Sequence, residues 1–456
     1  MKLMAHQAET ARQMSVVQPT GIINGSDPGT GKTIASLAGF MQSTIPNKRL
    51  LVLAPLTILK ASWLDDIEKA YGNTLKAQIA HGASKRYNVM RDQSNTVVVT
   101  NHDAVNWIAK DLSLLNGFTH MVIDESTAFK NPTTQRYKAI ALMRPHFQHI
   151  SVLSGTLRPN SILDLWGQVN LVDGGKSLGD QYYRFRATVC EPKQVGKDAK
   201  AIQWIEKDGA SDYVLDKIKH LFVRFRAEDC IDLPPHSERF MRLTMPPAIR
   251  KAYYDTLKNK AYVDEHNRVI PKNAGILVQK LQQILAGALY DEDGRVVSVH
   301  EDRTELTIDL VREREHSVVA YLWGHQLESL KKLADKHSIK YGVINGSVNV
   351  AERARVVDEF QAGNLQVVFA HPAAASHGLT LTRGTATIWT SPPMSAEHFL
   401  QFNRRIYRNG QTQKTETIMV AYDGTRETDL YDKLNGKIEG VMNTLAFAEL
   451  MTKVRD

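Results

Sequence analysis

Short apolar runs alternate with longer mixed stretches along the first third of the chain. Near-continuous runs of β-branched and aliphatic residues are typical of strands in a parallel sheet, which helices cover on both faces. The runs lie at residues 21–25, 49–55, 96–101, 120–125 and 149–156. The pattern therefore predicts an open α/β sheet, in which ligands bind at the carboxyl ends of the strands.

The second half of the chain repeats this pattern, with apolar runs at residues 316–323, 340–346, 365–370, 385–391 and 414–422. A length of 456 residues suits two domains, each with a core of its own. We therefore predict an α/β fold of two parallel-sheet lobes in tandem. The N-terminal lobe is expected over residues 1–230 and the C-terminal lobe over 231–456, because a Leu-Pro-Pro run at 233–235 interrupts regular structure.

The regular alternation is lost between the two predicted sheets, over residues 160–310. The apolar spacing of residues 273–289 predicts an amphipathic helix, and we expect a helical protrusion near residues 247–290. Residues 191–211 are mostly polar, which indicates an exposed insertion in the N-terminal lobe.

The composition limits the class of protein, the cellular location and the kind of partner that we expect. Apolar residues make up 43% of the chain, and no run reaches the roughly 20 apolar residues that cross a bilayer, so we expect no membrane association. The N-terminal sequence lacks a secretory signal pattern, which favours the cytoplasm of a bacterium or of a phage-infected cell. Two cysteines are too few for a structural zinc site. The net charge of +8 is compatible with a polyanionic partner, and the oligomeric state stays open, with a monomer as one option.

A glycine-rich loop, SDPGTGKT at residues 26–33, follows the first predicted strand and opens a helix. This is the context of a phosphate loop, in which backbone N–H groups and a lysine contact phosphates and a hydroxyl contacts Mg²⁺. The strict pattern has glycine where Ser26 stands, and a plain turn before a helix is the alternative interpretation. The residues expected to bind ATP are Gly29, Thr30, Gly31, Lys32 and Thr33, with Thr33 also on Mg²⁺.

Two adjacent carboxylates, Asp124 and Glu125, end a buried apolar run. An acidic strand end by itself is more often a helix cap or a solvated turn. With a phosphate loop upstream, the pair is suited to catalysis: Asp124 is expected on the metal and Glu125 as the general base for the attacking water. The Ser-Gly-Thr run at 154–156 ends the next strand, and we consider a coupling role or a plain turn there.

The run QFNRRIYRNGQ at residues 401–411 places Arg405 and Arg408 three residues apart, on what we expect to be one face of a helix. Alone, such a helix is only a solvated basic surface. Together with a distant phosphate loop, the arginine pair indicates an ATP site divided between two lobes that move during hydrolysis. Loss of the pair should therefore abolish ATPase activity rather than reduce it.

Several motifs together resemble the Swi/Snf-type branch of the superfamily-two helicases. The resemblance lies in DESTAFKN (124–131), LSGTLRPNSILDLWGQVNLV (153–172), LVLAPLTILKASWLDDIEK (51–69), RFRAEDCIDLPP (224–235) and QFNRRIYRNGQ (401–411). It covers most of the chain except residues 191–211 and the C-terminal end. It implies two RecA-like lobes, an adenine-reading role for Gln7, γ-phosphate contacts from Arg405 and Arg408, and supporting positions for Gln401 and Gln411.

The same resemblance implies contacts with the nucleic-acid backbone, which carry affinity without sequence information. The segments at 345–364 and 371–384 are similar to those that follow the fourth motif and form the fifth motif of the family. Departures occur at Ala375, Ser376, His377 and Thr380, and Thr127 replaces the family's usual histidine beside the acidic pair. The expected contacts are Thr57, Lys60, Lys130, Ser347, Arg353 and Thr380.

These observations predict a two-lobed, DNA-dependent ATPase that uses ATP and Mg²⁺ to translocate on duplex or branched DNA, in branch migration, fork reversal, recombination or repair. Two alternatives stay open. One is a helicase that separates strands of DNA or RNA. The other is a nucleic-acid-binding scaffold that uses ATP only as a conformational switch.

Overall fold

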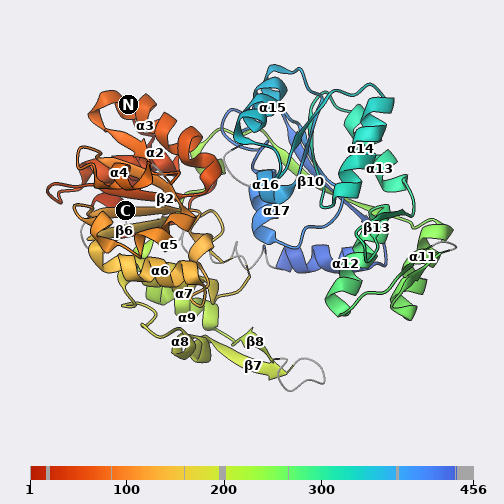
Figure 1. The fold of residues 1–456 in the computed structure, drawn as a ribbon, viewed down its shortest axis with the longest axis horizontal. Helices are drawn as coiled ribbons and strands as arrows, with labels where there is room; N and C mark the ends of the chain where they lie inside the picture. The colour runs from red at the N-terminus through yellow and green to blue at the C-terminus, as the bar shows by residue number, and fades with distance from the viewer. Residues whose placement is uncertain are drawn as a thin grey trace. The chain divides into compact units, whose positions relative to one another are not determined.

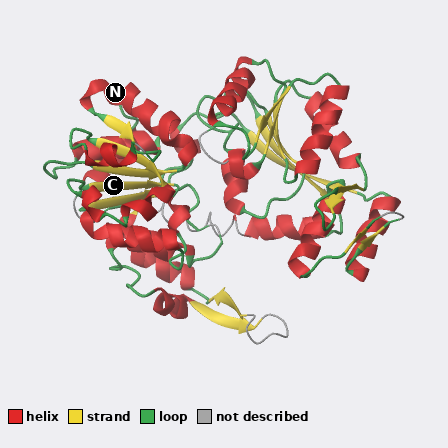
Figure 2. Cartoon of the chain, viewed as in Figure 1, coloured by secondary structure: helices red, strands yellow, loops and turns green. Residues whose placement is uncertain are grey.

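A computed structural model describes residues 2–16, 21–83, 85–158, 160–194, 202–264, 267–375, 379–436 and 438. Two compact units make up this part of the chain: one comprises the described residues up to Asp232 together with residue 438, and the other spans Leu233–Gly436. Each unit is an α/β domain with its own sheet (Figures 1 and 2). Among the described residues, no helix is long and apolar enough to span a bilayer.

The described part of the N-terminal unit contains a seven-stranded sheet in the order β3-β4-β2-β5-β6-β1-β9, and every neighbouring pair is parallel. Its strands are β1 (Ile23–Asn24), β2 (Leu50–Ala54), β3 (Ala77–Ile79), β4 (Val97–Asn101), β5 (His120–Asp124), β6 (His149–Leu153) and β9 (Phe222–Val223). All five predicted strands are confirmed. The sequence pattern missed β3, which is only partly buried, and the two-residue strand β9.

Helices cover both faces of this sheet, with α2 and α3 on one side and α6 and α7 on the other (Figure 1). The helices are α1 (Ala5–Ser15), α2 (Lys32–Gln42), α3 (Asp65–Tyr71), α4 (Arg86–Arg91), α5 (Val105–Ile108), α6 (Gln135–Met143), α7 (Asp164–Asp173), α8 (Tyr182–Val189), α9 (Ala210–Ile218) and α10 (Ala227–Cys230). The polar insertion expected at 191–211 contains an antiparallel hairpin of β7 (Cys190–Gln194) and β8 (Ile202–Glu206), and residues 195–201 lie outside the described part.

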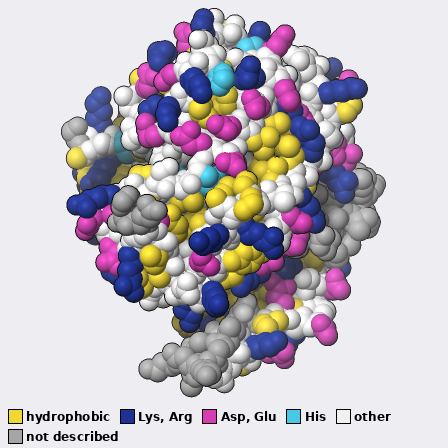
Figure 3. Space-filling view, turned by 90° about the vertical axis from the view of Figure 1, so that its right-hand side faces the viewer, with side chains coloured by type: hydrophobic (Ala, Val, Ile, Leu, Met, Phe, Trp, Pro, Cys, Tyr) yellow, Lys and Arg dark blue, Asp and Glu magenta, His cyan; other side chains and the backbone are white. Residues whose placement is uncertain are grey.

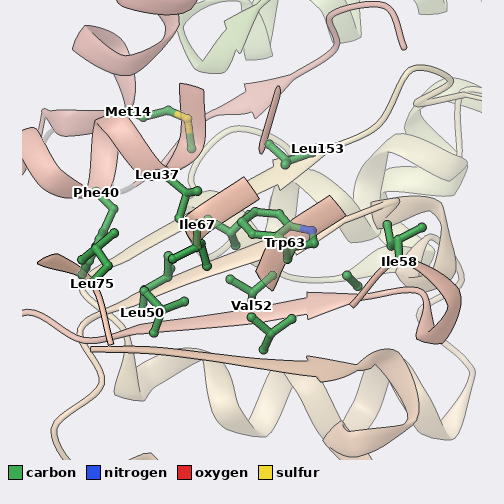
Figure 4. Packing of buried hydrophobic residues seen from close by; sticks show 14 of the residues in the cluster. Met14, Leu37, Phe40, Leu50, Val52, Ile58, Trp63, Ile67, Leu75 and Leu153 are labelled. Atoms are coloured by element: carbon green, nitrogen blue, oxygen red, sulfur yellow. The ribbon is translucent and has the colours of Figure 1, made fainter. Parts of the chain in front are cut away.

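The core between the sheet and helices α2 and α3 is made mostly of aliphatic side chains around Trp63. Trp63 is fully buried there, among Leu37, Val52, Ile58 and Ile67 (Figure 4). Every residue of β2 is buried, as the unbroken apolar run predicted for a strand covered on both faces. Trp63 lies on a π-helical turn, Leu59–Leu64, that leads directly into α3.

The described part of the C-terminal unit contains a six-stranded sheet in the order β10-β19-β18-β15-β17-β16, again parallel throughout. Its strands are β10 (His236–Leu243), β15 (Ser317–Ala320), β16 (Tyr341–Ile344), β17 (Val367–Ala370), β18 (Ala386–Trp389) and β19 (Thr415–Tyr422). All five predicted strands of this half are confirmed. The edge strand β10 was missed because its exposed polar positions hide the apolar pattern.

Helices and two small hairpins complete the C-terminal unit. The helices are α11 (Pro247–Asn259), α12 (Ala274–Leu285), α13 (Asp302–Arg312), α14 (Gly324–Lys336), α15 (Val350–Ala362), α16 (Pro372–Ala375) and α17 (Ala396–Asn403). The hairpins pair β11 (Tyr262–Val263) with β12 (Arg268–Val269), and β13 (Ala288–Tyr290) with β14 (Val296–Ser298). The helix predicted at 273–289 is therefore shorter, because its last residues form β13. On the face shown in Figure 3, basic and acidic side chains are interspersed rather than segregated.

Candidate active site

The loops that carry the predicted catalytic residues leave neighbouring strands of the N-terminal sheet. Strand β6 lies between β5 and β1, and the register sets Leu153 beside both Asp124 and Asn24. The carboxyl ends of parallel strands meet at one edge of a sheet, so the three following loops are adjacent. A Cβ at Gly155 would lie 3.1 Å from the Pro28 Cδ of the glycine-rich loop. The sheet order therefore assembles one site from segments far apart in sequence.

The glycine-rich loop requires glycine for both conformation and space. Gly29 and Gly31 have φ of 89° and 80°, in the left-handed region that L side chains disfavour. A Cβ at Gly31 would lie only 2.3 Å from the Gln7 Nε2. Lys32 is the first residue of α2, and its Nζ donates to the carbonyls of Ser26 at 2.8 Å and Asp27 at 3.1 Å. The free N–H groups at this helix start are suited to phosphate oxygens.

Two side chains of α1 hold the loop from outside. Gln7 Nε2 donates to the Thr30 carbonyl at 3.2 Å, and His6 Nε2 lies 2.8 Å from the same oxygen, where a neutral imidazole donates. The Gln7 Oε1 accepts from the Met4 N–H at 3.1 Å. The structure thus places Gln7 against the phosphate loop, and its expected role in reading adenine stays a prediction.

The start of the loop is tied to the segment that follows β9. The Ser26 hydroxyl accepts from the Phe225 N–H at 3.1 Å, which gives a physical role to the serine that replaces the usual glycine. Arg224 is almost fully buried; its Nη1 lies 3.2 Å from an Asp27 carboxylate oxygen and donates to the Gly25 carbonyl at 2.8 Å. A second Asp27 oxygen accepts from the Ala227 N–H at 3.2 Å. These bonds fix the loop to the C-terminal end of the unit.

The acidic pair lies at the end of β5, as predicted. Asp124 is buried, and each of its carboxylate oxygens accepts one bond: Oδ2 from the Trp63 indole N–H at 3.0 Å and Oδ1 from the Glu125 N–H at 3.0 Å. His102 Nε2 lies 2.7 Å from the Asp124 carbonyl, and desolvation of this partly buried imidazole lowers its pKa to about 4, which favours the neutral form. Glu125 has φ of 49° and ψ of 58°, a strained conformation for a residue with a side chain.

Charges in this site act on one another. Burial lowers the pKa of Lys32 because it disfavours the ammonium form, and the carboxylates of Glu125, Asp124 and Asp27 act in the opposite direction. Burial also raises the pKa of Asp124, while the Trp63 N–H and the Lys32 charge oppose that rise. The lysine and the two predicted catalytic carboxylates therefore belong to one electrostatic site.

The oxygen ligands present fit Mg²⁺. Among the described residues, no group of three or more His, Cys, Asp or Glu side chains could enclose a metal ion. Mg²⁺ needs no such cage, since it is usually held by one or two carboxylates together with the substrate phosphates. The Asp124 carboxylate and the Thr33 hydroxyl, the second residue of α2, supply that kind of donor set beside Lys32.

A buried glutamine joins the acidic pair to the following motif. Gln168 is fully buried on α7; its Oε1 accepts from the Ser126 hydroxyl at 2.6 Å, and its Nε2 donates to the carbonyls of Leu157 at 2.7 Å and Asp164 at 2.8 Å. Ser126 directly follows Glu125, and Leu157 follows the Ser-Gly-Thr run. Thr127, which stands where the family has histidine, is buried beside this link. Coupling between the two motifs stays a prediction, and Gln168 gives it a physical path.

The predicted arginine helix is wrong. Helix α17 begins after Ser395, whose side chain accepts from the His398 N–H, and it ends at Asn403, so Arg405 and Arg408 lie in the turns beyond it. The Asn403 side chain accepts from the buried Trp389 indole at 2.8 Å, which holds the helix end in place.

The two arginines nevertheless meet at one backbone oxygen. Arg405 Nη1 and Arg408 Nη1 donate to the Leu379 carbonyl at 3.2 and 3.0 Å, and Arg405 Nε donates to the Gln401 carbonyl at 2.8 Å. Arg405 is 5% exposed, so it is not a solvated surface arginine. Gln411 Nε2 donates to the carbonyls of Thr382, Gly384 and Ile406, and so joins this turn to the preceding loop.

The predicted nucleic-acid contacts lie on short helical turns, on helix α15 and on loops, in both units. In the N-terminal unit, Lys60 is exposed, Lys130 is half-buried, and the Thr57 hydroxyl is buried without a hydrogen-bond partner among the described residues. In the C-terminal unit, Ser347 is exposed and Thr380 is half-buried.

Arg353 is partly buried within its own unit, where it donates to the carbonyls of Ala374 at 3.4 Å and Asn345 at 3.2 Å. Ser376 and His377 lie outside the described residues, so the predicted departures from the fifth motif at these positions stay predictions.

Three residues of the site were not predicted from the sequence: Trp63, Gln168 and Arg224. Their signals were weak. Trp63 and Gln168 lie in mostly apolar segments, where a buried side chain is expected only to pack, and Gln168 shares its helix with another polar residue, Asn170. Arg224 stands 192 residues after Lys32 in sequence, and only the pairing of β9 with β1 brings it to the loop.

Comparisons with known proteins identify the family. The family model described as SNF2-related domain matches residues 6–287, and the model described as helicase conserved C-terminal domain matches residues 301–410. A solved structure, the Sulfolobus solfataricus SWI2/SNF2 ATPase core in complex with dsDNA, shows 20% identity and a TM-score of 0.45, and the match covers 99% of this chain and 95% of that chain.

Curated relatives come from a phage and from eukaryotes. Protein p41 of Acyrthosiphon pisum secondary endosymbiont phage 1 is 27% identical over 403 residues, which are 84% of each chain. The SNF2 domain-containing protein ENL1 of Oryza sativa subsp. japonica is 24% identical over 502 residues, covering 94% of this chain and half (50%) of that protein. The SWI/SNF-related matrix-associated actin-dependent regulator of chromatin subfamily A-like protein 1 of Xenopus tropicalis is 23% identical over 439 residues, covering 92% of this chain and 42% of that protein.

The two eukaryotic relatives are thus at least twice as long as the part that matches. The family expected from the motifs is confirmed, because the first model covers more than half of the chain. The chain therefore belongs to the SNF2-related family, the Snf2-like DNA-dependent ATPases of helicase superfamily two.

Proposed function

We propose that this ATPase converts ATP hydrolysis into translocation along double-stranded DNA. The family supports this proposal, and one observation carries it: the phosphate loop follows β1 and the acidic pair follows β5, the two strands on either side of β6, so that Lys32, Asp124 and Glu125 act on one another's charges. A cation, a carboxylate for a metal and a general base in one place are suited to hydrolysis, not only to nucleotide binding.

Each residue of the N-terminal site has a role in this proposal. Asp124 and Thr33 hold Mg²⁺, which neutralises charge on the phosphates when bound. Glu125 accepts a proton from the attacking water. Lys32 exchanges its bonds to two loop carbonyls for bonds to phosphate oxygens. The N–H groups of Gly29, Thr30 and Gly31 contact the same phosphates.

Further nucleotide contacts are proposed from the family resemblance. Arg405 and Arg408 stabilise the negative charge that develops on the transferred phosphoryl group, with Gln401 beside them. Their donors already converge on the Leu379 carbonyl, so they move as one unit. Gln7 reads adenine while its amide stays close to the phosphate loop.

We propose that the protein binds DNA through contacts with the backbone phosphates. Such contacts give affinity that does not depend on sequence and that falls with salt, as a motor that advances along any DNA needs. The exposed Lys60 and Ser347 are the most direct candidates. The complete proposed set is Thr57, Lys60, Lys130, Ser347, Arg353 and Thr380.

The proposed substrate is duplex or branched DNA, in branch migration, fork reversal, recombination or repair. The similarity to a phage protein supports a task on DNA itself, in the cytoplasm of a bacterium or an infected cell, rather than on chromatin. This step rests on analogy between relatives. A strand-separating helicase on DNA or RNA is the second candidate, since the helicase C-terminal model also matches the chain.

The test is steady-state ATPase activity without nucleic acid and with single-stranded DNA, linear duplex, a four-way junction and duplex RNA. Glu125→Gln is the inactive reference, and Glu68→Gln, which changes an exposed acid on α3 of the same unit, is the matched control. Strong stimulation by duplex or junction DNA in the wild type and in Glu68→Gln, absent in Glu125→Gln, is the expected result.

Other outcomes of this assay would favour one of the two alternative functions. Equal stimulation by single strands, or stimulation by RNA alone, would favour the strand-separating helicase. Slow turnover that ignores every nucleic acid would refute the motor and favour an ATP-switched scaffold. Displacement of a triplex-forming strand from duplex DNA, dependent on ATP, then separates translocation from strand separation.

A further inference from the structure

The segment between β2 and α3 links a proposed DNA contact to the catalytic carboxylate. It consists of a 3₁₀ turn, Leu56–Ile58, followed without interruption by the π-helical turn Leu59–Leu64. Thr57 and the exposed Lys60 lie on this segment, and Trp63 is one turn further along. Single π-helical turns are rare and occur frequently at functional sites.

Trp63 connects this segment to Asp124 directly. Its indole is 0% exposed and packs in the core above β2 (Figure 4), and its N–H donates to the Asp124 Oδ2 at 3.0 Å. The other oxygen, Oδ1, accepts from the Glu125 N–H. The carboxylate plane is therefore held by two donors, one from its own strand end and one from the segment of the proposed DNA contact.

The segment also has a reason to rearrange. The Thr57 hydroxyl is buried and has no hydrogen-bond partner among the described residues. A buried hydroxyl without a partner is unfavourable, so a movement that brings it to a phosphate oxygen is favoured. Because Trp63 lies on the π-helical turn that directly follows the turn of Thr57, such a movement also displaces its indole N–H.

We propose that Trp63 is a positioning residue that carries DNA binding at Thr57 and Lys60 to the Asp124 carboxylate, and so makes ATP hydrolysis depend on DNA. The inference rests on the proposed function, in which this segment contacts DNA and Asp124 holds Mg²⁺. Groups that orient a metal-binding carboxylate typically affect metal affinity or activity 10- to 100-fold when they are lost.

The first test removes the N–H and keeps the shape. Replacing Trp63 with benzothienylalanine exchanges the indole N–H for sulfur, and Trp63→Phe is the simpler variant. Trp166→Phe is the matched control, because the Trp166 indole is also buried in this unit and donates to a backbone carbonyl, that of Gly179, at 3.1 Å.

The expected result has two parts. The half-saturating Mg²⁺ concentration rises roughly tenfold and stimulation by duplex DNA falls roughly tenfold or more in both Trp63 variants, within the range for residues that orient metal ligands. The affinity for duplex DNA, measured by fluorescence anisotropy without nucleotide, stays unchanged. Trp166→Phe keeps the wild-type stimulation. Unchanged stimulation and Mg²⁺ dependence in a folded benzothienylalanine variant would overturn the proposal.

The second test does not depend on activity. In protein labelled with 5-fluorotryptophan, the ¹⁹F resonance of residue 63, assigned by its loss in Trp63→Phe, is expected to shift when duplex DNA is added without metal or nucleotide. The buried indole cannot touch DNA, so a shift reports a movement of the segment. The shift should be absent in Lys60→Ala. A resonance that stays in place at saturating DNA refutes the inference.

The two failures are distinguishable. If the wild type shows no DNA-stimulated ATPase activity, the proposed function fails. If the wild type is stimulated and the Trp63 variants are stimulated equally, the proposed function stands and only the role of Trp63 fails.

Discussion

Replacement of Gln168 by leucine tests how the acidic pair is joined to the motif after β6. Leucine fills a similar volume but has no polar atoms. The change removes a 2.6 Å bond from the Ser126 hydroxyl and bonds of 2.7 and 2.8 Å to two backbone carbonyls, at a position that is 0% exposed. The Ser126 hydroxyl and the Leu157 carbonyl are then left buried without their partner.

The expected loss of stability follows from these two groups. Each buried polar group left unsatisfied costs about 1–3 kcal/mol, so the two groups together should make Gln168→Leu destabilise the N-terminal unit by about 2–6 kcal/mol. Ser126→Ala removes only one bond and should cost about 1 kcal/mol. In the double variant no serine hydroxyl is left without a partner. Its loss of stability should therefore be smaller, by about 1 kcal/mol, than the sum of the losses in the two single variants.

The measurement is urea unfolding of the four proteins, with hydrogen exchange in β5 and β6 reporting on the N-terminal unit alone. Gln13→Leu is the control: this buried glutamine of α1 donates to Glu9, away from the acidic pair. At a temperature where all variants are folded, DNA-stimulated turnover of Gln168→Leu should still fall, whereas that of Gln13→Leu should not. Additive losses of stability, or wild-type turnover in folded Gln168→Leu, would refute the reasoning.

Three further predictions concern the ion pair of the C-terminal core, the strained catalytic residue and acid stability. Arg303 and Glu427 form an ion pair at 2.6 Å, and their side chains are 1% and 0% exposed. Glu427→Gln should therefore lower the free energy of unfolding of the C-terminal unit in urea by about 3–5 kcal/mol. Glu328→Gln, which breaks an exposed pair with Lys331, should lower it by less than about 1 kcal/mol, and equal losses in the two variants would contradict this prediction. Glu125 has a left-handed backbone conformation, which glycine adopts without strain, so Glu125→Gly should be more stable than Glu125→Gln by about 1 kcal/mol. Both variants should lose ATP hydrolysis, because both remove the proposed general base. A lower melting temperature of Glu125→Gly than of Glu125→Gln would contradict strain at this residue. Burial lowers the pKa of His149 from 6.5 to about 4. Because the folded value is depressed, protonation of this imidazole lowers stability by up to about 3 kcal/mol as the pH falls from 6.5 to 4, and it has no effect above that window. His149→Gln should therefore flatten the acid limb of a stability-against-pH curve and leave the slope of its neutral part unchanged.

The sequence predicts the sheets well because each central strand is an unbroken apolar run. Strands such as β2 and β17 are buried on both faces, and no other element of that length requires so many aliphatic residues. Edge strand β10 escapes the same pattern because one of its sides faces solvent, and its stability comes from pairing with β19 along eight residues. Its position depends on a partner nearly two hundred residues away, which no local pattern contains.

Local sequence rules likewise predict some residues of the site and miss others. Gly29, Gly31, Lys32, Asp124 and Glu125 follow from local rules, because a phosphate loop needs left-handed glycines and a strand end carries its carboxylates. The arginine turn does not follow from local rules: Arg405 and Arg408 were expected on a helix, but the helix ends at Asn403, whose side chain accepts from the Trp389 indole. Trp63 and Gln168 act through single hydrogen bonds between distant segments, and such bonds have no periodicity to detect.

The two sets of proposed catalytic cations share one feature that bears on how nucleotide binding is driven. Lys32 donates to the carbonyls of Ser26 and Asp27, and both arginines donate to the carbonyl of Leu379. These bonds to neutral carbonyls are already charge-assisted, and phosphate oxygens, which carry negative charge, attract the same donors more strongly. When phosphate oxygens take the place of the carbonyls, the buried Arg405 needs little further desolvation, whereas Lys32 and Arg408 are only partly buried. The cations on each unit are thus held by oxygen acceptors in advance, which reduces the reorganisation needed for binding and for the transition state.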